Sequence, residues 1–197
     1  MNKSGNDNRS VRNTKKKLQD AMLTLLEHKS ISEITVKELT DAVDINRGTF
    51  YFHYEDVHAL LKEMEDRFFT QFYLMVNSIP LPPGESTRLT AVFSFIGENA
   101  DFCRIMLGPH GDITFLRRVR QLLSEKCSDL WDAQSASIDG EVKNLFNAFI
   151  IQGCIGIIQM WVSEDCKAPP VEISRLTETI VRSSVNQYVK QANGGRL

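Results

Sequence analysis

The sequence has few of the residues that build catalytic or metal centres. Its four histidines are dispersed, and His53 and His58 are five residues apart, so they do not share a helix face as paired metal ligands do. No glycine-rich phosphate-binding loop is present, and Asp101 and Asp112, which flank a turn, are weak evidence for acid–base catalysis. We therefore expect no enzymatic activity, no catalytic residue, no metal and no cofactor.

Signals for export or membrane insertion are also scarce. No secretory signal precedes Arg9, and the four cysteines occur without a Cys-x-x-Cys pair, which favours reduced thiols in the cytoplasm. Residues 145–162 are apolar, but their length is marginal for a membrane span. Polar residues interrupt or flank this stretch: Asn147, Gln152, Gln159, Glu164 and Asp165. A cytoplasmic protein without a membrane partner is the favoured interpretation, and a membrane span is the alternative.

No run alternates apolar and polar residues for long enough to suggest a β-strand. Apolar residues instead recur at spacings of three and four, which is typical of amphipathic helices. Proline and glycine interrupt this pattern at 80–84, at 108–111 and at 169–170. The predicted helices cover residues 57–78, 87–99, 100–107, 113–131, 141–162 and 173–189. We therefore predict an all-α fold.

The net charge is only −2, so the total charge does not point to a nucleic-acid partner. The charge is unevenly distributed, however. Residues 1–54 carry nine Lys or Arg against seven Asp or Glu, whereas the remainder is acidic. Arg9, Arg12 and Lys15–Lys17 follow one another without an intervening acid, which could form a basic arm that reaches phosphate. A solvated helix start is an equally good interpretation of the same residues.

Two short helices with strong start signals lie between residues 35 and 54. Thr35 and Glu38 are three residues apart and form a capping-box pattern, and Asn46 is a preferred N-cap for the second helix. The three residues 43–45 between the helices form the turn, in which Asp44 tolerates a left-handed backbone. This is the pattern of a helix-turn-helix.

The second of these helices presents side chains that donate hydrogen bonds to phosphates or base edges. Because the first residues of a recognition helix lie at the base edges, Arg47 is the best candidate to read guanine, although a phosphate contact is nearly as good an interpretation. Thr49 could contact a thymine methyl or a phosphate, or could only support the helix. Gly48 costs helix stability, so a close approach to DNA or to a neighbouring helix should offset that cost.

Residues 35–54 resemble the DNA-reading segment of the TetR/AcrR family of bacterial transcriptional regulators, and the match extends from Leu18 to Leu60. Asp44 stands where the family usually has Gly, Phe52 where the residue is usually polar, and Val57 where relatives often have a phosphate-contacting Lys. The resemblance implies a three-helix DNA-binding domain followed by a larger helical domain for effector binding and dimerisation. The expected divisions are a disordered tail at 1–8 and domains at 9–55 and 56–197.

The resemblance also implies that Tyr51 and His53 clamp phosphates. The expected partners are double-stranded DNA with a pseudo-palindromic sequence, a second copy of the chain and an unknown small-molecule effector. The candidate DNA-binding residues are Arg47, Thr49, Tyr51, His53, Gly48, Thr35, Lys37 and Asn46.

Residues 141–162 are apolar almost all round, so this helix must be covered on every side. One small helical chain leaves little to cover it, and a second copy is the natural partner. With the last helix, this segment resembles the pair that forms the four-helix dimer interface of TetR-like proteins. The alternative is local packing or a kink within a monomer. The expected interface residues are Phe149, Gly153, Gly156, Ile157, Met160, Ile180 and Tyr188.

The family resemblance further implies a small ligand held among the helices after Ile79. The candidate pocket residues, each more often found in a core than in a binding site, are Phe93, Phe102, Phe115, Trp131 and Phe149. Residues 102–111 resemble a TetR subgroup that includes a dihydroxyacetone-pathway activator. A second functional hypothesis is a ligand-sensing or protein-binding dimer with little DNA affinity, which Phe52, Val57 and the acidic remainder of the chain favour.

Overall fold

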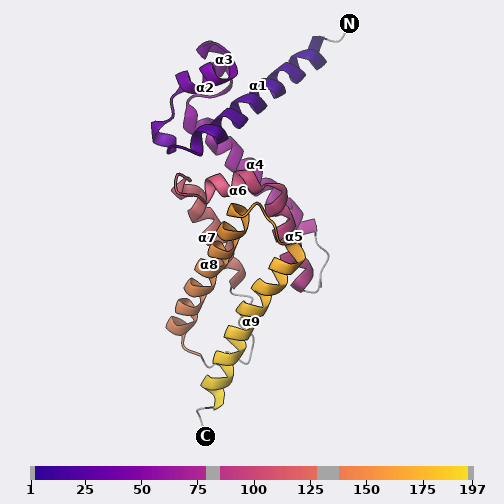
Figure 1. The fold of residues 1–197 in the computed structure, drawn as a ribbon, viewed down its shortest axis with the longest axis vertical. Coiled ribbons are helices and arrows are strands. Elements are labelled where there is room, and N and C mark those ends of the chain that lie inside the picture. The colour runs from indigo at the N-terminus through magenta and orange to yellow at the C-terminus, as the bar shows by residue number, and fades with distance from the viewer. Residues whose placement is uncertain (1–2, 79–84, 128–137, 195–197) are drawn as a thin grey trace. The chain divides into compact units, whose positions relative to one another are not determined.

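The computed structural model describes residues 3–78, 85–127 and 138–194, and all regular structure within them is helical. This confirms the predicted all-α fold. The elements, labelled in Figure 1, are α1 (Lys3–Leu26), the short 3-10 helix η1 (Ile31–Glu33), α2 (Val36–Val43), α3 (Arg47–His53), α4 (Val57–Ser78), α5 (Glu85–Glu98), α6 (Ala100–Met106), α7 (Ile113–Cys127), α8 (Gly140–Ser163) and α9 (Pro170–Gly194).

The chain forms two compact units, which we describe separately. The N-terminal unit consists of Met1–Tyr73 together with Ile105–Asp112, and the C-terminal unit consists of Leu74–Arg104 together with Ile113–Leu197. The domain boundary expected from the sequence lies at the start of α4, whereas the compact units divide α4 after Tyr73.

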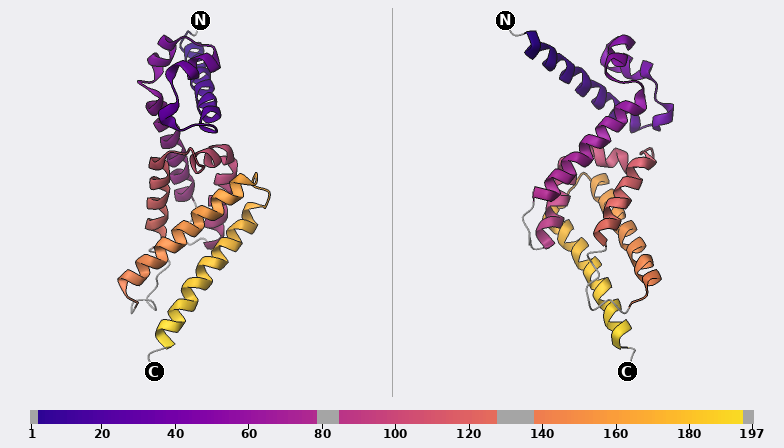
Figure 2. Two further views of the ribbon diagram at one scale, coloured as in Figure 1. Left: turned by 60° about the vertical axis from the view of Figure 1, so that its left-hand side comes forward. Right: turned by 180° about the vertical axis from the view of Figure 1, so that it is seen from behind.

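The core of the N-terminal unit is built from one buried face of each helix. Helix α2 packs on α1 and α3 packs on α2 (Figure 2). The apolar residues that the sequence places three or four positions apart on α1 and α4 point inward, as the helical period requires. The side chains that are at most 2% exposed include Leu18, Met22, Leu26, Leu39, Phe50 and Leu60.

Helix α1 begins at Lys3, where a disordered tail was expected over residues 1–8. Residues 1–2 lie outside the described residues. Once the burial of Leu18, Met22 and Leu26 has fixed part of a helix, each further turn adds hydrogen bonds without a new nucleation cost.

The C-terminal unit is organised around contacts of α5 with the beginning of α9 and with the end of α8. Thr90 and Ser174 share a hydrogen bond of 2.7 Å between α5 and α9. The rings of Phe93 and Trp161 meet edge to face, with centroids 5.5 Å apart. The Trp161 indole N–H also donates to the carbonyl oxygen of Ala168, 2.9 Å away, which fixes the loop between α8 and α9.

Helices α8 and α9 also share a small apolar core of their own. Ile150 and Val185 are each 5% exposed at its centre. The partly buried hydrophobic residues packed against them are Phe146, Ile151, Cys154, Val181 and Val189. This contact uses only one side of α8.

The described helix boundaries agree with the predicted ranges to within a few residues, and the largest difference is at the end of α9, five residues beyond the predicted 189. That helix begins at Pro170, three residues before the predicted start at Ile173. Proline fits the first position of a helix because its missing N–H would have no intrahelical partner there. Residues 128–131 of the predicted helix 113–131 lie outside the described residues.

Gly111 lies in the turn that follows α6, and a side chain there has no room. A Cβ atom at this position would lie 2.1 Å from the carbonyl oxygen of Met106, which is a backbone atom that cannot turn away. We predict that Gly111→Ala lowers the free energy of unfolding by about 2 kcal/mol or more, measured by urea denaturation. The matched control is Gly140→Ala, because nothing lies within 4 Å of a Cβ at Gly140. Equal stability of the two variants would contradict the prediction.

Candidate nucleic-acid interface

Helix α2 begins with the capping box that the sequence predicted. The backbone N–H of Glu38 donates to the Thr35 hydroxyl oxygen at 3.3 Å, and the backbone N–H of Thr35 donates to the Glu38 carboxylate at 2.9 Å. Lys29 also donates to the Glu38 carboxylate. These contacts satisfy N–H groups that the first turn of a helix otherwise leaves unpaired.

Helix α3 begins with the predicted asparagine cap. The Asn46 side-chain oxygen accepts the backbone N–H of Thr49 at 2.8 Å and the Thr49 hydroxyl at 3.2 Å. Before it, Asp44 adopts the left-handed conformation with φ 54° and ψ 54°, which confirms its expected role in the turn. Caps and turn together set the angle at which α3 leaves α2.

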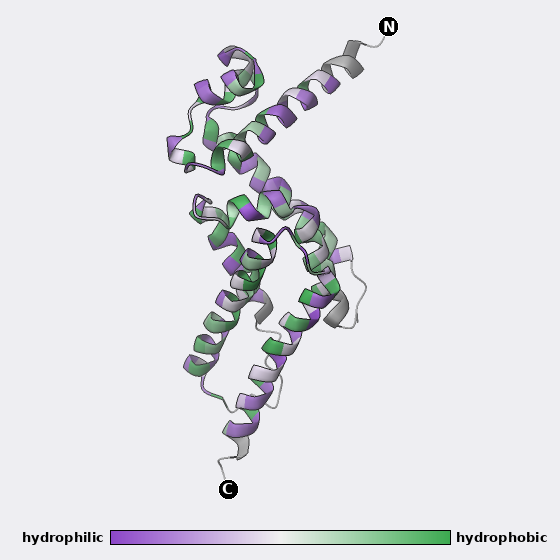
Figure 3. Cartoon of the chain, in the orientation of Figure 1, coloured by the Kyte–Doolittle hydropathy of each residue, from purple (hydrophilic) through white to green (hydrophobic). Residues whose placement is uncertain are grey.

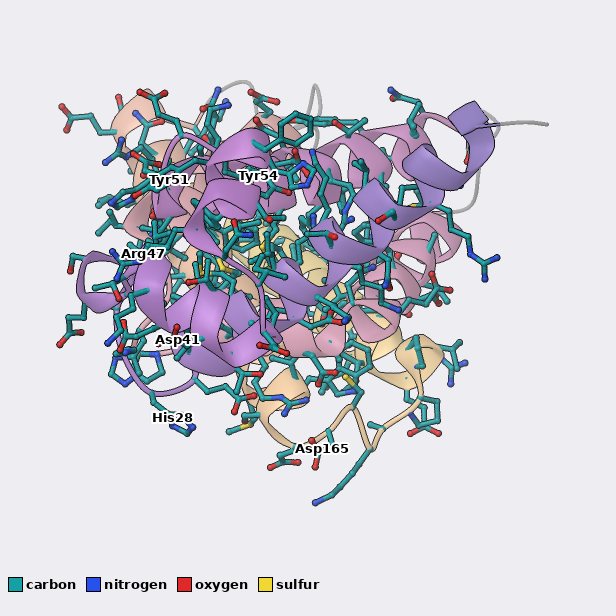
Figure 4. All side chains as sticks on the ribbon, turned by 90° about the horizontal axis from the view of Figure 1, so that it is seen from above. His28, Asp41, Arg47, Tyr51, Tyr54 and Asp165 are labelled. Atoms are coloured by element: carbon teal, nitrogen blue, oxygen red, sulfur yellow. The ribbon has the colours of Figure 1, made fainter. Side chains whose placement is uncertain are left out.

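One face of α3 is exposed and the other is buried. Phe50 is fully buried and Tyr54, directly after the helix, is 5% exposed. Tyr51 is 58% exposed and Phe52 79% exposed, and Arg47 lies on the same side as Tyr51, one turn earlier (Figure 4). The Arg47 guanidinium has no hydrogen-bond or ion-pair partner among residues 3–78, 85–127 and 138–194. It is therefore available to an external acceptor.

The other candidate DNA-binding residues differ in their solvent exposure and in their neighbours. Lys37 is exposed, whereas His53 is half-buried beside the rings of Phe52 and Tyr54, with centroids 5.0 and 6.3 Å away. Gly48 is exposed, and a Cβ there would lie 3.1 Å from the Asn46 side-chain oxygen. The sequence suggested that Gly48 lies close to DNA or to a neighbouring helix. Within the described residues, the atom nearest to a Cβ at Gly48 belongs to the Asn46 cap and not to a neighbouring helix.

Glu63 joins three parts of the N-terminal unit. From α4 its carboxylate accepts Lys15 Nζ of α1 at 2.7 Å and the hydroxyl of Tyr54, the C-cap residue of α3, at 3.0 Å. The Lys15 ammonium also lies 5.0 Å from the centre of the Tyr54 ring. Burial raises the pKa of the Tyr54 hydroxyl, and the hydrogen bond to Glu63 raises it further, so this hydroxyl stays a donor.

This network changes the interpretation of the basic arm. Lys15 is committed to Glu63, whereas Arg9, Arg12, Lys16 and Lys17 are exposed on α1. Sequence reasoning missed Glu63 because its partners are 48 and 9 residues away. The tyrosine at position 54, where the family pattern has Phe, was the one available signal that a polar partner faces this position.

The candidate pocket residues fall into separate places in the C-terminal unit. Phe93 is 2% exposed and packs on Trp161, while Phe102 packs on Phe115, which is 1% exposed, with centroids 5.5 Å apart. Phe149 is 67% exposed on α8 and is not part of either pair. Trp131 lies outside the described residues.

The candidate interface residues lie mostly on an exposed stripe of α8, which we define as Leu145, Phe149, Gln152, Gly153, Gly156 and Met160. Phe149 and Met160 are 67% and 66% exposed. Ile180 of α9 is 45% exposed, whereas Ile157 is half-buried and Tyr188 packs on Phe146 with centroids 5.0 Å apart.

Figure 3 shows that α8 is hydrophobic along most of its length. By length and composition α8 could also cross a membrane, a property that core helices of soluble proteins share.

Comparison with known proteins decides the family. A family model described as "Transcriptional regulator C-terminal region" (TetR_C_8) matches residues 86–183. Over 169 residues the chain is 27% identical to the uncharacterized HTH-type transcriptional regulator YxbF of Bacillus subtilis strain 168, covering 80% of this chain and 42% of that protein. The chain belongs to the TetR family of transcriptional regulators. It spans less than half the length of YxbF.

Solved structures agree with this TetR-family assignment at the level of the fold. A TetR transcriptional regulator from Streptococcus agalactiae 2603V has a TM-score of 0.64 and 22% identity, covering 89% of this chain and 97% of that one. The dihydroxyacetone kinase operon activator DhaS has a TM-score of 0.53 and 15% identity, covering 88% and 96%. At such identities the similarity shows the fold only, and membership of the dihydroxyacetone-pathway subgroup stays a prediction.

The capping box of this TetR-family chain should weaken in acid. Hydrogen bonds from Lys29 and then from Thr35 lower the pKa of Glu38 to about 2. A lowered pKa in the folded state means that the stabilisation is fully present above the ordinary glutamate value and is lost as pH falls toward 2. We predict that Glu38→Gln lowers the melting temperature most near neutral pH and progressively less between about pH 5 and pH 2.

Lys29→Gln provides the control for this prediction. Because it removes the strongest donor to Glu38, the effect of Glu38→Gln in that background should be smaller at neutral pH. An effect of Glu38→Gln that does not change between pH 7 and pH 3 would contradict the assigned role of the charge.

Proposed function

We propose that this chain is a cytoplasmic, dimeric transcriptional regulator that reads a pseudo-palindromic DNA operator through the major groove. The exposed face of α3 carries the proposal, because it combines Arg47, which has no partner among the described residues, with the exposed Tyr51 on a helix held by caps and a buried face. Residues 9–55 would form the DNA-binding domain and residues 56–197 the effector-binding and dimerisation domain.

Arg47 is the residue proposed to read sequence. Its guanidinium can donate two parallel hydrogen bonds to O6 and N7 of guanine, a contact that typically gives about 1–3 kcal/mol of discrimination. Tyr51 and His53 are proposed to donate to phosphates and so to set the register. His53 is half-buried, so part of its imidazole ring is accessible for such a contact.

The helix starts supply secondary phosphate contacts in this proposal. Lys37 is exposed and carries the only full positive charge on α2. Thr35 and Thr49 already donate their hydroxyl and backbone N–H hydrogens within the caps, so either hydroxyl would have to turn away from its cap to donate to phosphate. The Asn46 side-chain oxygen accepts in the cap, and its NH2 group is the donor that it can offer to phosphate. The exposed basic side chains of α1, which are Arg9, Arg12, Lys16 and Lys17, would add charge without reading sequence.

The exposed stripe of α8 is proposed to pack against a second copy, together with Ile180 on α9. Large exposed apolar patches on soluble proteins mark interaction sites, and glycines let two helix backbones approach closely. A membrane is the less suitable partner because Gln152 lies in the middle of the stripe and Asn144 is exposed one turn before Ala148. A second copy would supply a matching surface by two-fold symmetry.

Dimerisation matters for recognition because a single short helix contacts too few base pairs to define a site. Two copies related by two-fold symmetry double the contacts and require half-sites one or more helical turns apart. A small effector bound within the C-terminal unit would regulate DNA binding if it favours one dimer geometry over another. The buried rings near Phe93 and Phe115 are the proposed surroundings of such an effector.

Selection from a random pool of DNA duplexes with the purified chain at moderate salt tests the proposal. We expect an enriched sequence with two-fold symmetry, and an affinity that falls linearly with salt concentration on logarithmic axes because counterions are released. Folded, dimeric protein that enriches no sequence at any salt concentration would favour instead a ligand-sensing or protein-binding dimer with little DNA affinity.

Two variants of α3 should separate sequence readout from phosphate contact. We predict that Tyr51→Phe weakens binding to all duplexes by a similar factor, because it removes a donor to the backbone. Arg47→Ala should in addition lose the preference for guanine at one position per half-site, about tenfold or more. Binding profiles over a library of single-base operator variants provide the measurement. An unchanged preference in Arg47→Ala would show that Arg47 does not read a base.

A charge within the stripe should separate the two copies. We predict that Phe149→Glu and Gly156→Glu give monomers at micromolar concentration, because the dimer would bury an unpaired carboxylate. Sedimentation velocity measures the change. Asn186→Glu, at an exposed position of α9 outside the stripe, is the matched control and should remain dimeric. Dimers of all three variants would place the interface elsewhere.

A further inference from the structure

Phe52 is the most exposed of the large apolar side chains in the part of the chain that the structure describes, at 79%. It lies on a helix whose other phenylalanine, Phe50, is completely buried. The ring of Phe52 meets the His53 ring edge to face, at 5.0 Å between centroids. The core therefore does not require a phenylalanine at this position, and an aliphatic or polar residue would leave the packing of Phe50 intact.

The position of Phe52 on α3 limits what its ring can meet. Residues 47, 48, 51 and 52 follow the helical spacing of one face, and all four are exposed. The residue one turn before Phe52 on this face is Gly48, which has no side chain to shield the ring. Phe52 thus projects from the same surface as Arg47 and Tyr51, so whatever that surface binds also meets the phenyl ring.

The chemistry of the ring then selects its contact within DNA. A phenyl group has no N–H or O–H to donate, so it cannot pair with phosphate oxygens or with the acceptors on the bases. The apolar group that the major groove offers is the 5-methyl group of thymine, which phenylalanine side chains contact. Apolar wedges that unstack bases act from the minor groove, where a recognition helix does not lie.

We infer that Phe52 is a specificity-determining residue that selects thymine through its 5-methyl group, within the half-site that Arg47 reads. The inference rests on the proposed function, since it assigns the α3 surface to the major groove. It differs from the role of Arg47 in the kind of discrimination: Arg47 selects by hydrogen bonds, whereas Phe52 selects by burying a methyl group.

Replacement of thymine by uracil in the selected operator tests this assignment, because uracil lacks only the methyl group and keeps every hydrogen-bonding atom. Each thymine is replaced in turn, in both half-sites, and binding is measured for the full-length chain and for Phe52→Ala. We expect one position per half-site at which uracil weakens binding of the unsubstituted chain about fourfold, or roughly fifteenfold for both half-sites together. Phe52→Ala should bind the thymine and uracil duplexes equally at that position.

Three controls make the result specific. Phe52→Leu keeps an apolar side chain and should keep part of the thymine preference. Tyr73→Ala removes another exposed aromatic ring, 46% exposed on α4, and should leave the preference unchanged. The melting temperature of Phe52→Ala should match that of the unsubstituted chain, because the ring lies outside the core.

The outcomes distinguish this inference from the proposed function. Uracil effects that are the same in Phe52→Ala and in the unsubstituted chain, or a symmetric operator with no methyl-sensitive thymine, would overturn the role of Phe52 while leaving a sequence-specific regulator. If no duplex is enriched at all, the proposed function fails, and the assignment of Phe52 to DNA fails with it.

Discussion

The burial of Phe50, together with the side-chain caps at the starts of α2 and α3, is the constraint on which the α3 surface depends. Helices of eight and seven residues, the lengths of α2 and α3, are not stable alone in water. The caps at Thr35 and Asn46 satisfy N–H groups at their starts, and the buried rings of Phe50 and Tyr54 hold α3 in one rotation about its axis. With that rotation set, Arg47, Tyr51 and Phe52 face outward together. The Glu63 carboxylate, which accepts from Lys15 and Tyr54, ties the end of α3 to two longer helices.

Helix α8 poses a different physical problem, because it has more apolar surface than residues 3–78, 85–127 and 138–194 cover. One side packs on α9 and on the aromatic residues around Trp161, where Ile150, Ile155 and Val162 are at most 5% exposed. The other side, from Leu145 to Met160, remains exposed. A stable soluble protein does not usually leave several large apolar side chains exposed along one side of a helix. The proposed dimer would therefore cover the apolar side chains of α8 that its own helices leave exposed.

Predictions from the sequence succeeded where the physical cause is local. The cap residues, the left-handed Asp44 and the start of α4 all follow from interactions within four residues, and the structure confirms each of them. Predictions were weaker where the partner is distant. Lys15 looked like part of a free basic arm, but an acceptor 48 residues away holds it. Phe149 was assigned both to a pocket and to an interface, and its 67% exposure separates it from the buried aromatic pairs.

The sequence by itself determined the helical class, the order and approximate extent of the helices and the position of the helix-turn-helix, because periodicity, capping and turn chemistry act over a few residues. Only the tertiary structure decided which side chains are available for binding. Whether an aromatic ring is buried like Phe115 or exposed like Phe52 depends on which helices lie against it. That arrangement depends on the packing of the whole unit, and no short stretch of sequence records it.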